Sequence, residues 1–435
     1  MERLTAFVSE HLNDDTTRLV MNRAKWPKID MDLAVNCIES RRKLKGKVQE
    51  WYDEPGLVFP RKLSAEQCSS TATGVYKADL AIKIALCSPE CKPEKGFRLA
   101  DLTGGLGVDS WFFSRKAEQV LYCEMLPELC MAAQHNYKVL KADNITVRNA
   151  AVISETQILQ QISSEDEGQN AESVSVFQTP TQILADYQPD IVYMDPARRG
   201  EGGKKVFLIE DCTPDVLTLK DEIFQHTRHI LLKLSPMADI TMVCERLGKC
   251  CREVHVVAAG GECKELLIWM DREWDNDYMI HAVELHKGAD AGVFSFTTTQ
   301  EKNAVKAMVD GNTFLFEPGK SLMKAGAFNL ISERFEISKL GNSTHYYTFD
   351  NIEKAEVLKQ HGKVFRILRM QPLDKRTIKA AGKEFPKAEV TARNIPMDTD
   401  TLRKKLGVTS GDDAHIFGLK SDTAGMLLLI CSVIR

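Results

Sequence analysis

Hydrophobic positions in the first 95 residues follow a helical spacing. Apolar side chains recur every three or four residues among charged ones over residues 19–25 and 33–52, which is the pattern of amphipathic helices. A polar patch at residues 66–70, followed by Lys77, is interpreted as a helix cap and a surface lysine, with the lining of a cleft as the alternative. The pattern predicts a helical N-terminal region over residues 1–95.

Between residues 96 and 275, short apolar runs alternate with amphipathic stretches such as 126–140. The runs predict five strands, which are residues 97–102, 120–123, 145–147, 190–194 and 230–234. Two further runs, 254–258 and 265–269, flank a pair of glycines and predict a closing hairpin. Strands that alternate with helices indicate an α/β fold, with a mostly parallel sheet covered on both faces.

The rest of the chain predicts two smaller parts. Residues 276–360 carry strand-like runs and are expected to form a β-rich connecting domain. Residues 361–435 predict a small α+β domain in the order strand, helix, strand, helix, strand, strand. Residues 163–170 are polar and acidic, which predicts a mobile loop inside the α/β region.

The first strand of the α/β region ends in a glycine-rich turn. Asp101 closes the strand, and Thr103, Gly104, Gly105 and Gly107 follow before the next helix. In open α/β sheets, ligands bind beyond the carboxyl ends of the strands. Glycines in such a turn let the backbone approach a ligand closely, so this turn is a candidate cofactor site.

Two cofactors fit this turn. A nicotinamide site has the pattern G-x-G-x-x-G, and Ser110 stands here at the third glycine. The methyltransferase pattern, acid-x-Gly-x-Gly-x-Gly, is matched at residues 101–107 with Thr103 replacing one glycine. The strand acid favours S-adenosylmethionine, because the amino group and the sulfonium of this cofactor are cationic. Glu124 ends the second strand, where an acid can accept hydrogen bonds from ribose hydroxyls.

A second signal follows the fourth predicted strand, at Asp195-Pro196-Ala197-Arg198. Methyltransferases that modify an exocyclic or amide nitrogen carry Asn- or Asp-Pro-Pro-aromatic at this place. A carboxylate and a backbone carbonyl can hold the N–H bonds of the target and aim its lone pair, so that proximity does most of the work. No aromatic residue is present in this motif, and Arg198 can supply a stacking plane or hold a phosphate. The alternatives are a surface ion pair and an ordinary Asp-Pro turn.

The net charge of −4 is unevenly distributed. Residues 361–435 hold 14 Lys and Arg against 8 Asp and Glu, a net charge of +6, so the remainder carries −10. A basic terminal domain on an acidic body predicts contact with a polyanion, and the alternative is a solvated surface that is rich in lysine.

Other functional classes lack support. The 12 cysteines form no C-x-x-C pair, so we expect free thiols and no metal site. No stretch is long and apolar enough to span a bilayer, which leads us to expect a cytoplasmic protein.

At these motifs the chain resembles bacterial class I S-adenosylmethionine-dependent methyltransferases with a C-terminal THUMP-like domain. The core match covers residues 96–275, is most specific at 101–109, and is similar to trimethylguanosine synthase and to RNA base methyltransferases. The second motif departs from the Asp-Pro-Pro-Trp type of the guanosine enzymes. The C-terminal match begins near residue 316 and includes Arg393-Asn394 and residues 402–406. The resemblance implies a Rossmann-like sheet followed by ferredoxin-like and THUMP-like parts, with domains at 1–95, 96–275, 276–360 and 361–435.

The resemblance also implies a role for each motif position. The positions implied to contact the cofactor are Asp101, Thr103, Gly104, Gly105, Gly107, Glu124 and, near the adenine, Asn149. Asp195 with Pro196 would hold the acceptor nitrogen, and Arg198 is a further catalytic candidate. THUMP domains bind RNA, so a methyltransferase acting on a base nitrogen in tRNA or rRNA is the leading hypothesis. The alternatives are a protein or small-molecule substrate, a non-catalytic RNA-binding protein, and a nicotinamide-dependent dehydrogenase.

Overall fold

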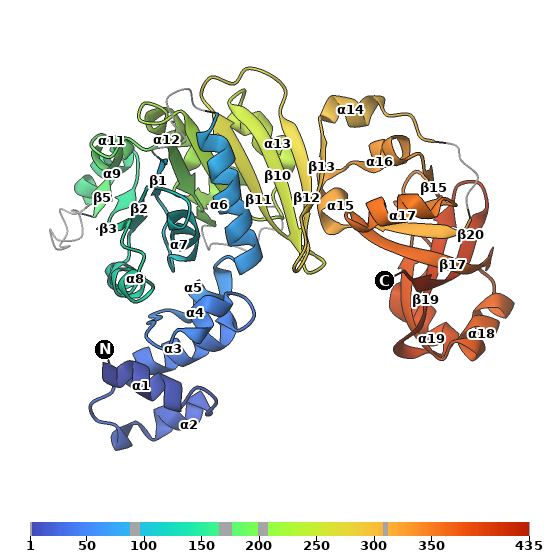
Figure 1. Ribbon diagram of the computed structural model, residues 1–435, viewed down its shortest axis with the longest axis horizontal. Coiled ribbons are helices and arrows are strands. Elements are labelled where there is room, and N and C mark those ends of the chain that lie inside the picture. The colour runs from blue at the N-terminus through green and yellow to red at the C-terminus, as the bar shows by residue number, and fades with distance from the viewer. Residues whose placement is uncertain (1, 88–95, 165–175, 199–207, 308–311, 435) are drawn as a thin grey trace. The chain divides into compact units, whose positions relative to one another are not determined.

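The computed structural model describes residues 2–87, 96–164, 176–198, 208–307 and 312–434 (Figure 1). It divides into two units, of which the first comprises Met1–Val254 with Leu266–Asp277, and the second comprises His255–Glu265 with Tyr278–Arg435. Strands β10 (Cys251–Ala259) and β11 (Glu262–Asp271) contribute residues to both units. Most of the predicted mobile loop at 163–170 lies outside the described residues.

The first unit begins with helices, as the sequence pattern predicts. They are α1 (Glu2–Glu10), α2 (Thr16–Met21), α3 (Met31–Leu44), α4 (Gln49–Asp53), α5 (Lys62–Gln67) and α6 (Thr71–Ala85). The helical pattern over 33–52 proves to be two helices, because Gly46 takes a φ of 71° and breaks the run. Ser70 caps α6 by accepting a hydrogen bond from the Thr73 amide.

A mostly parallel sheet forms the core of this unit. Its parallel strands, in spatial order, are β3 (Ile145–Asn149), β2 (Gln119–Glu124), β1 (Arg98–Asp101), β6 (Ile191–Met194) and β9 (His229–Leu234). Strand β11 pairs antiparallel with β9. All five predicted strands are therefore present, and the two predicted hairpin strands are β10 and β11.

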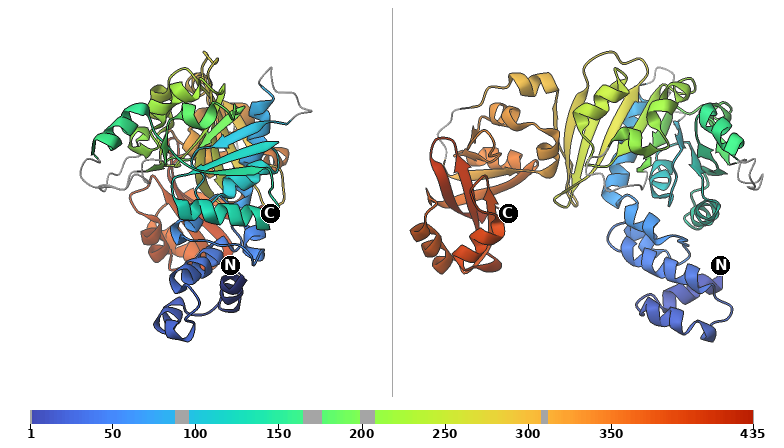
Figure 2. Two further views of the ribbon diagram at one scale, coloured as in Figure 1. Left: turned by 90° about the vertical axis from the view of Figure 1, so that its left-hand side faces the viewer. Right: turned by 180° about the vertical axis from the view of Figure 1, so that it is seen from behind.

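Helices cover both faces of this sheet. The helices that follow its strands include α7 (Val108–Ser114), α8 (Pro127–Val139), α9 (Glu155–Ser164), α11 (Pro180–Leu184), α12 (Val216–Ile223) and α13 (Ile240–Leu247). Helix α6 lies on one face, whereas α12 and α13 lie on the other (Figures 1 and 2). Every residue of β6 is buried, as expected for a strand that is covered on both sides. The edge at the carboxyl ends of β1, β2 and β6 is consequently the place open to a ligand.

The second unit contains the antiparallel pair β12 (Met279–Leu285) and β13 (Gly292–Phe296) and a seven-stranded sheet. That sheet runs in the order β15 (Ser338–Lys339), β16 (Tyr347–Phe349), β14 (Phe314–Pro318), β17 (Gly362–Pro372), β20 (Gly425–Val433), β19 (Thr409–Ser421) and β18 (Lys387–Arg393). The sequence pattern missed the helices α14 (Thr298–Asn303), α15 (Lys320–Ala325), α16 (Phe328–Phe335) and α17 (Ile352–Lys359). Each has only six to eight residues, too few for a helical period to stand out.

The C-terminal part of this unit has the predicted α+β order. Helices α18 (Lys375–Glu384) and α19 (Thr399–Leu406) bury Ile378 and Leu402 in one core with Val390, Ile416 and Ile430 of the strands. The opposite sides of these two helices are exposed and carry most of the helices' own basic side chains. The apolar stripe therefore fixes which side of each helix presents its charges to solvent.

Candidate active site

The register of the central strands brings the two sequence motifs together. Asp101 pairs with Tyr122 on β2 and with Tyr193 on β6, so Asp101, Glu124 and Asp195 all lie at the same edge of the sheet. These three side chains line one cavity of about 360 Å³. The cavity is also lined by Thr103, Gly104, Gly105, Gly107, Ala197 and the predicted polar patch residues Gln67, Cys68 and Ser69.

The glycines of the turn are required by two buried tyrosines. A Cβ on Gly104 would lie 2.2 Å from the ring of Tyr122, and one on Gly107 would lie 2.3 Å from the hydroxyl of Tyr137. Gly107 also takes a φ of 90°, in the left-handed region. The Tyr122 hydroxyl donates to the carbonyl of Gly105 at 2.7 Å, and the Tyr137 hydroxyl donates to that of Gly107 at 3.0 Å. The hydroxyls of Tyr122 and Tyr137 thus hold the turn in place through its carbonyls, and the backbone of the turn lines the cavity.

Asp101 is almost completely buried beneath the turn. Its Oδ2 accepts a hydrogen bond from the Ser110 hydroxyl at 2.6 Å, and its Oδ1 accepts one from the Thr103 amide at 3.0 Å. Burial raises the pKa of Asp101 to about 7, although these two hydrogen bonds oppose the rise. The carboxyl group therefore changes its charge near neutral pH.

Glu124 holds the loops on either side of the cavity. Its Oε2 accepts from the Gly105 amide and its Oε1 from the Leu126 amide, both at 2.9 Å. Asn149 is turned away from this position, because its amide donates to the carbonyls of Glu124 and Met125 at 2.8 and 3.1 Å. Asn149 is absent from the described cavity lining, where its neighbour Ala150 takes part instead.

Asp195 lies at the mouth of the cavity with its side chain 37% exposed. Its backbone amide donates to Thr103 Oγ1 at 2.6 Å, so the threonine that replaces a motif glycine joins the two motifs. Its Oδ2 lies 2.5 Å from Nζ of Lys233 on β9. Pro196 is buried, and Arg198 belongs to the short strand β7 (Ala197–Arg198), with its side chain outside the described part of the structure.

Sequence reasoning missed a buried array of charges behind this motif. Asp109 Oδ2 accepts from the Tyr193 hydroxyl at 2.8 Å and from Ser69 Oγ at 3.0 Å, and it lies 3.9 Å from Lys233 Nζ. Asp109 Oδ1 lies 3.3 Å from Nζ of Lys77. Burial alone would raise the pKa of Asp109, but Lys77 and Lys233 hold it below its ordinary value.

The interpretation of Lys77 as a surface lysine is therefore wrong. Its side chain is 0% exposed, and its Nζ donates to Ser69 Oγ at 2.8 Å. The signal was available in the sequence, because Lys77 shares a helical face with the buried residues Thr73, Leu80 and Ala81, at spacings of three and four. A lysine on the apolar face of a helix needs a buried anion, which Asp109 provides.

We expect Lys77→Met to lower the free energy of unfolding by about 3 kcal/mol, because Asp109 would lose its nearer cation in a buried place. Urea unfolding followed by circular dichroism measures the loss. Lys43→Met is the matched control, because Lys43 pairs with Glu66 while 51% exposed, and such surface pairs contribute less than about 1 kcal/mol. Equal losses in the two variants would contradict the role assigned to Lys77.

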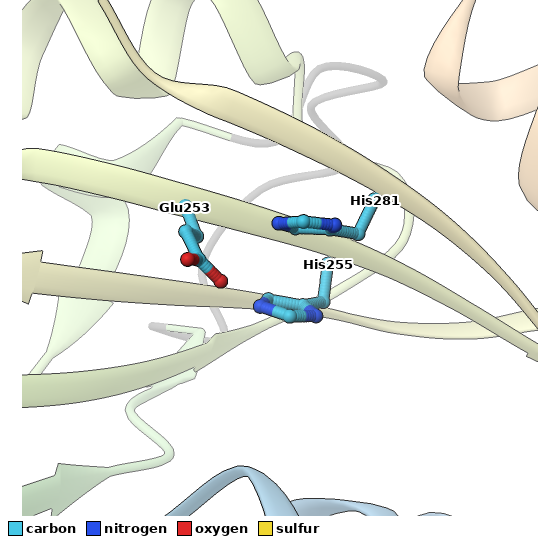
Figure 3. Close-up of side chains that lie close together, drawn as sticks. All are labelled: Glu253, His255 and His281. Atoms are coloured by element: carbon cyan, nitrogen blue, oxygen red, sulfur yellow. The ribbon is translucent and has the colours of Figure 1, made fainter. Parts of the chain in front are cut away.

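His255 and His281 of the second unit are of a residue type that can bind a metal ion. The rings of His255 on β10 and His281 on β12 stack with centroids 4.5 Å apart (Figure 3). The Nδ1 atom of His281 lies 2.7 Å from Ser295 Oγ. Glu253, also drawn in Figure 3, is an ion-pair partner of Lys83 at 2.7 Å. We assign no metal to these side chains, and the absence of a metal site stays a prediction.

The cavity fits an adenosyl group in size and in chemistry. Its volume lies in the range of small-molecule sites. The part beside Glu124 is apolar, as a buried purine requires, and is formed by Met125, Leu126, Leu129, Ala150, Val152, Ile153 and Phe177. Asp101, beneath the glycine turn and between Glu124 and Asp195, suits the ammonium group of the methionine tail. In the described residues no helix is long and apolar enough to cross a membrane.

Comparisons with known proteins agree with this architecture. A model for a ferredoxin-like domain matches residues 314–355, and a model for a THUMP domain-like family matches residues 362–432. The structure of a "putative methyltransferase" of Porphyromonas gingivalis W83 superposes with a TM-score of 0.79 at 26% sequence identity, covering 100% of this chain and 98% of that one. None of the curated proteins matches the sequence.

Partial matches to other methyltransferases are much weaker. A ribosomal protein L11 methylase of Lactobacillus delbrueckii subsp. bulgaricus has 14% identity and a TM-score of 0.28, covering 50% of this chain and 82% of that one. The whole-chain match, the two family models and the parallel sheet together show a class I methyltransferase fold with a C-terminal THUMP-like domain.

Proposed function

We propose that the protein is an S-adenosylmethionine-dependent methyltransferase that acts on a base nitrogen in RNA. The observation that carries the proposal is the single cavity that joins Asp101, Glu124 and the glycine turn to Asp195. One end of this cavity suits a nucleoside and its amino-acid tail, and the other end suits a nitrogen acceptor. S-adenosylmethionine, when bound, supplies the methyl group.

The residues of the chain have separate tasks in this proposal. The acid at the end of β2, Glu124, faces the ribose, and Asp101 with the turn holds the amino-acid tail. Asp195 accepts a hydrogen bond from the N–H of the target and orients the nitrogen lone pair. Alkylation makes that proton acidic, so the carboxylate can take it without being a strong base. Asn149 stays a prediction as an adenine contact.

The C-terminal domain supports RNA as the partner. Exposed basic side chains on its two helices are Lys375, Arg376, Lys379, Lys383, Lys404 and Lys405. Among the described residues, the ion pairs of this part of the chain fall on Arg369 and Arg403 and on none of these six. Unpaired cations on one domain form the kind of surface that binds phosphates, and the match to a THUMP domain-like family agrees with such a role.

The proposal predicts that the purified protein binds S-adenosylhomocysteine in isothermal titration calorimetry. Because the pKa of Asp101 is about 7, its charge is present at pH 8 and mostly absent at pH 6. Binding of a ligand with an ammonium group should therefore tighten about tenfold between pH 6 and pH 8. Asp101→Ala should weaken binding on the order of tenfold at pH 8 and remove the pH dependence. If the wild type gives no binding heat at either pH, the proposed function fails.

A protein side chain or a small molecule is the second candidate substrate. It is favoured by the absence of an aromatic residue from the motif Asp195-Pro196-Ala197-Arg198, where related motifs supply a ring that stacks on a planar base. RNA from a strain that lacks the gene distinguishes the two. A methyl mark missing from a tRNA or rRNA base supports the first candidate, and an unchanged set of RNA methyl marks supports the second.

A further inference from the structure

Lys233 lies directly behind the proposed acceptor-binding acid. Strands β6 and β9 are parallel, with Met194 opposite Leu232, so the next step in register places Asp195 beside Lys233. The Lys233 side chain is 12% exposed and is absent from the described cavity lining, whereas Asp195 is part of that lining. A ligand in the cavity therefore meets the carboxylate, with the ammonium group behind it.

The pair leaves one oxygen of Asp195 for a ligand. Oδ2 is engaged by Lys233, and among the described residues none forms a hydrogen bond with Oδ1. The carboxylate can thus accept a hydrogen bond from one N–H group at Oδ1, while the ammonium group of Lys233 balances its negative charge.

The alternation of negative and positive charges continues beyond Asp195 and Lys233. Asp195, Lys233, Asp109 and Lys77 follow one another as acid, base, acid, base, with neighbouring charged atoms 2.5, 3.9 and 3.3 Å apart. The signs of these charges alternate, and the charged group nearest to the Asp195 carboxylate is the ammonium group of Lys233. A lone carboxylate would attract an alkylammonium, whereas a carboxylate paired with an ammonium group accepts hydrogen bonds with its charge balanced.

We infer that Lys233 is a specificity-determining residue, which cancels the charge of Asp195 so that the site takes a neutral nitrogen and discriminates against an alkylammonium. The inference depends on the proposed function and narrows its substrate class. A nitrogen conjugated to a ring, such as the exocyclic amine of a nucleobase, is neutral and fits the site. The protonated side chain of a lysine does not fit it.

Two ligands test this inference without a known substrate. Sinefungin carries an ammonium group where S-adenosylmethionine carries its methyl group, and S-adenosylhomocysteine carries no charge there. Calorimetry of both ligands gives the ratio of their dissociation constants. We expect Lys233→Met to shift the ratio toward sinefungin on the order of tenfold or more, because the cation that lies 2.5 Å from the Asp195 carboxylate is removed.

Control variants separate the charge of Lys233 from its bulk. Lys233→Arg keeps the charge and should keep the wild-type ratio, whereas Lys233→Gln removes the charge and should shift the ratio as Met does, which also guards against a Met variant that does not fold. Lys116→Met is the matched surface control, because Lys116 lies just after the C-terminal end of α7 and forms an ion pair with Asp79. Its ratio should stay unchanged.

The possible results distinguish a failure of this inference from a failure of the proposed function. If both ligands bind and the ratio is the same in wild type, Lys233→Met and Lys233→Gln, the inference is overturned while the proposed cofactor stands. A shift away from sinefungin overturns it equally. If the wild type binds neither ligand, the proposed function fails and this inference falls with it.

Discussion

Asp195→Ala should abolish methyl transfer, with a loss of at least roughly a thousandfold in kcat, while leaving the affinity for S-adenosylhomocysteine nearly unchanged. The carboxylate is assigned to the acceptor nitrogen, so its loss removes the orientation that provides most of the rate. The cofactor end of the cavity, at Asp101 and Glu124, would keep its own hydrogen bonds. The measurement is transfer of tritiated methyl groups to total RNA from a strain that lacks the gene, alongside calorimetry.

Asp221→Ala is the matched control for this experiment, because it makes the same chemical change on α12, at a side chain that is 81% exposed. It should transfer methyl groups at the wild-type rate. If Asp195→Ala kept at least a tenth of the wild-type rate, the carboxylate would not be the group that holds the acceptor.

Gly104→Ala should weaken S-adenosylhomocysteine binding by roughly a hundredfold and lower the free energy of unfolding by about 2–3 kcal/mol. The new methyl group would enter the ring of Tyr122, which is 0% exposed and cannot move aside. The turn would have to lift, and the hydrogen bond from the Tyr122 hydroxyl to Gly105 would break. Calorimetry and urea unfolding measure the two effects.

Gly105→Ala provides the comparison, because a Cβ there meets only the Thr103 carbonyl at 3.9 Å. Its φ of 55° leaves a cost of about 1–2 kcal/mol from left-handed backbone strain. In the Gly104→Ala background, Tyr122→Leu should recover part of the lost stability by making room for the methyl group. Equal stability of the two alanine variants, or no recovery, would show that the clash with Tyr122 does not govern the turn.

The sequence predicted the parallel sheet well because its signals are local. The apolar runs that became β1, β2, β6 and β9 are each bounded by polar or glycine residues. Asp101 and Asp195 were expected at strand ends, and the parallel register then places them at one edge. The short helices α14 to α17 escaped prediction, since one or two turns give too few repeats.

The polar network of the site could not be derived in the same way. The contact of Lys233 with Asp195 depends on which strands are neighbours, and those residues are 38 positions apart. The approach of Lys77 to Asp109 depends on how α6 packs against α7. Tyr122 and Tyr137 fix the glycine turn through ring positions that only the folded chain defines. Residue types at motif positions could be read from the sequence, but their partners could not.

Thr103 makes the two halves of the cavity mechanically dependent on each other. Its amide holds Asp101, and its hydroxyl accepts the backbone amide of Asp195 at 2.6 Å. Under the proposed function, we expect a ligand that shifts the glycine turn to shift also the loop that begins at Asp195. Occupation of one half would then alter the affinity of the other half, and by thermodynamic reciprocity the influence would be equal in both directions. A glycine at this position, as in the unmodified motif, would leave the two events uncoupled along this route.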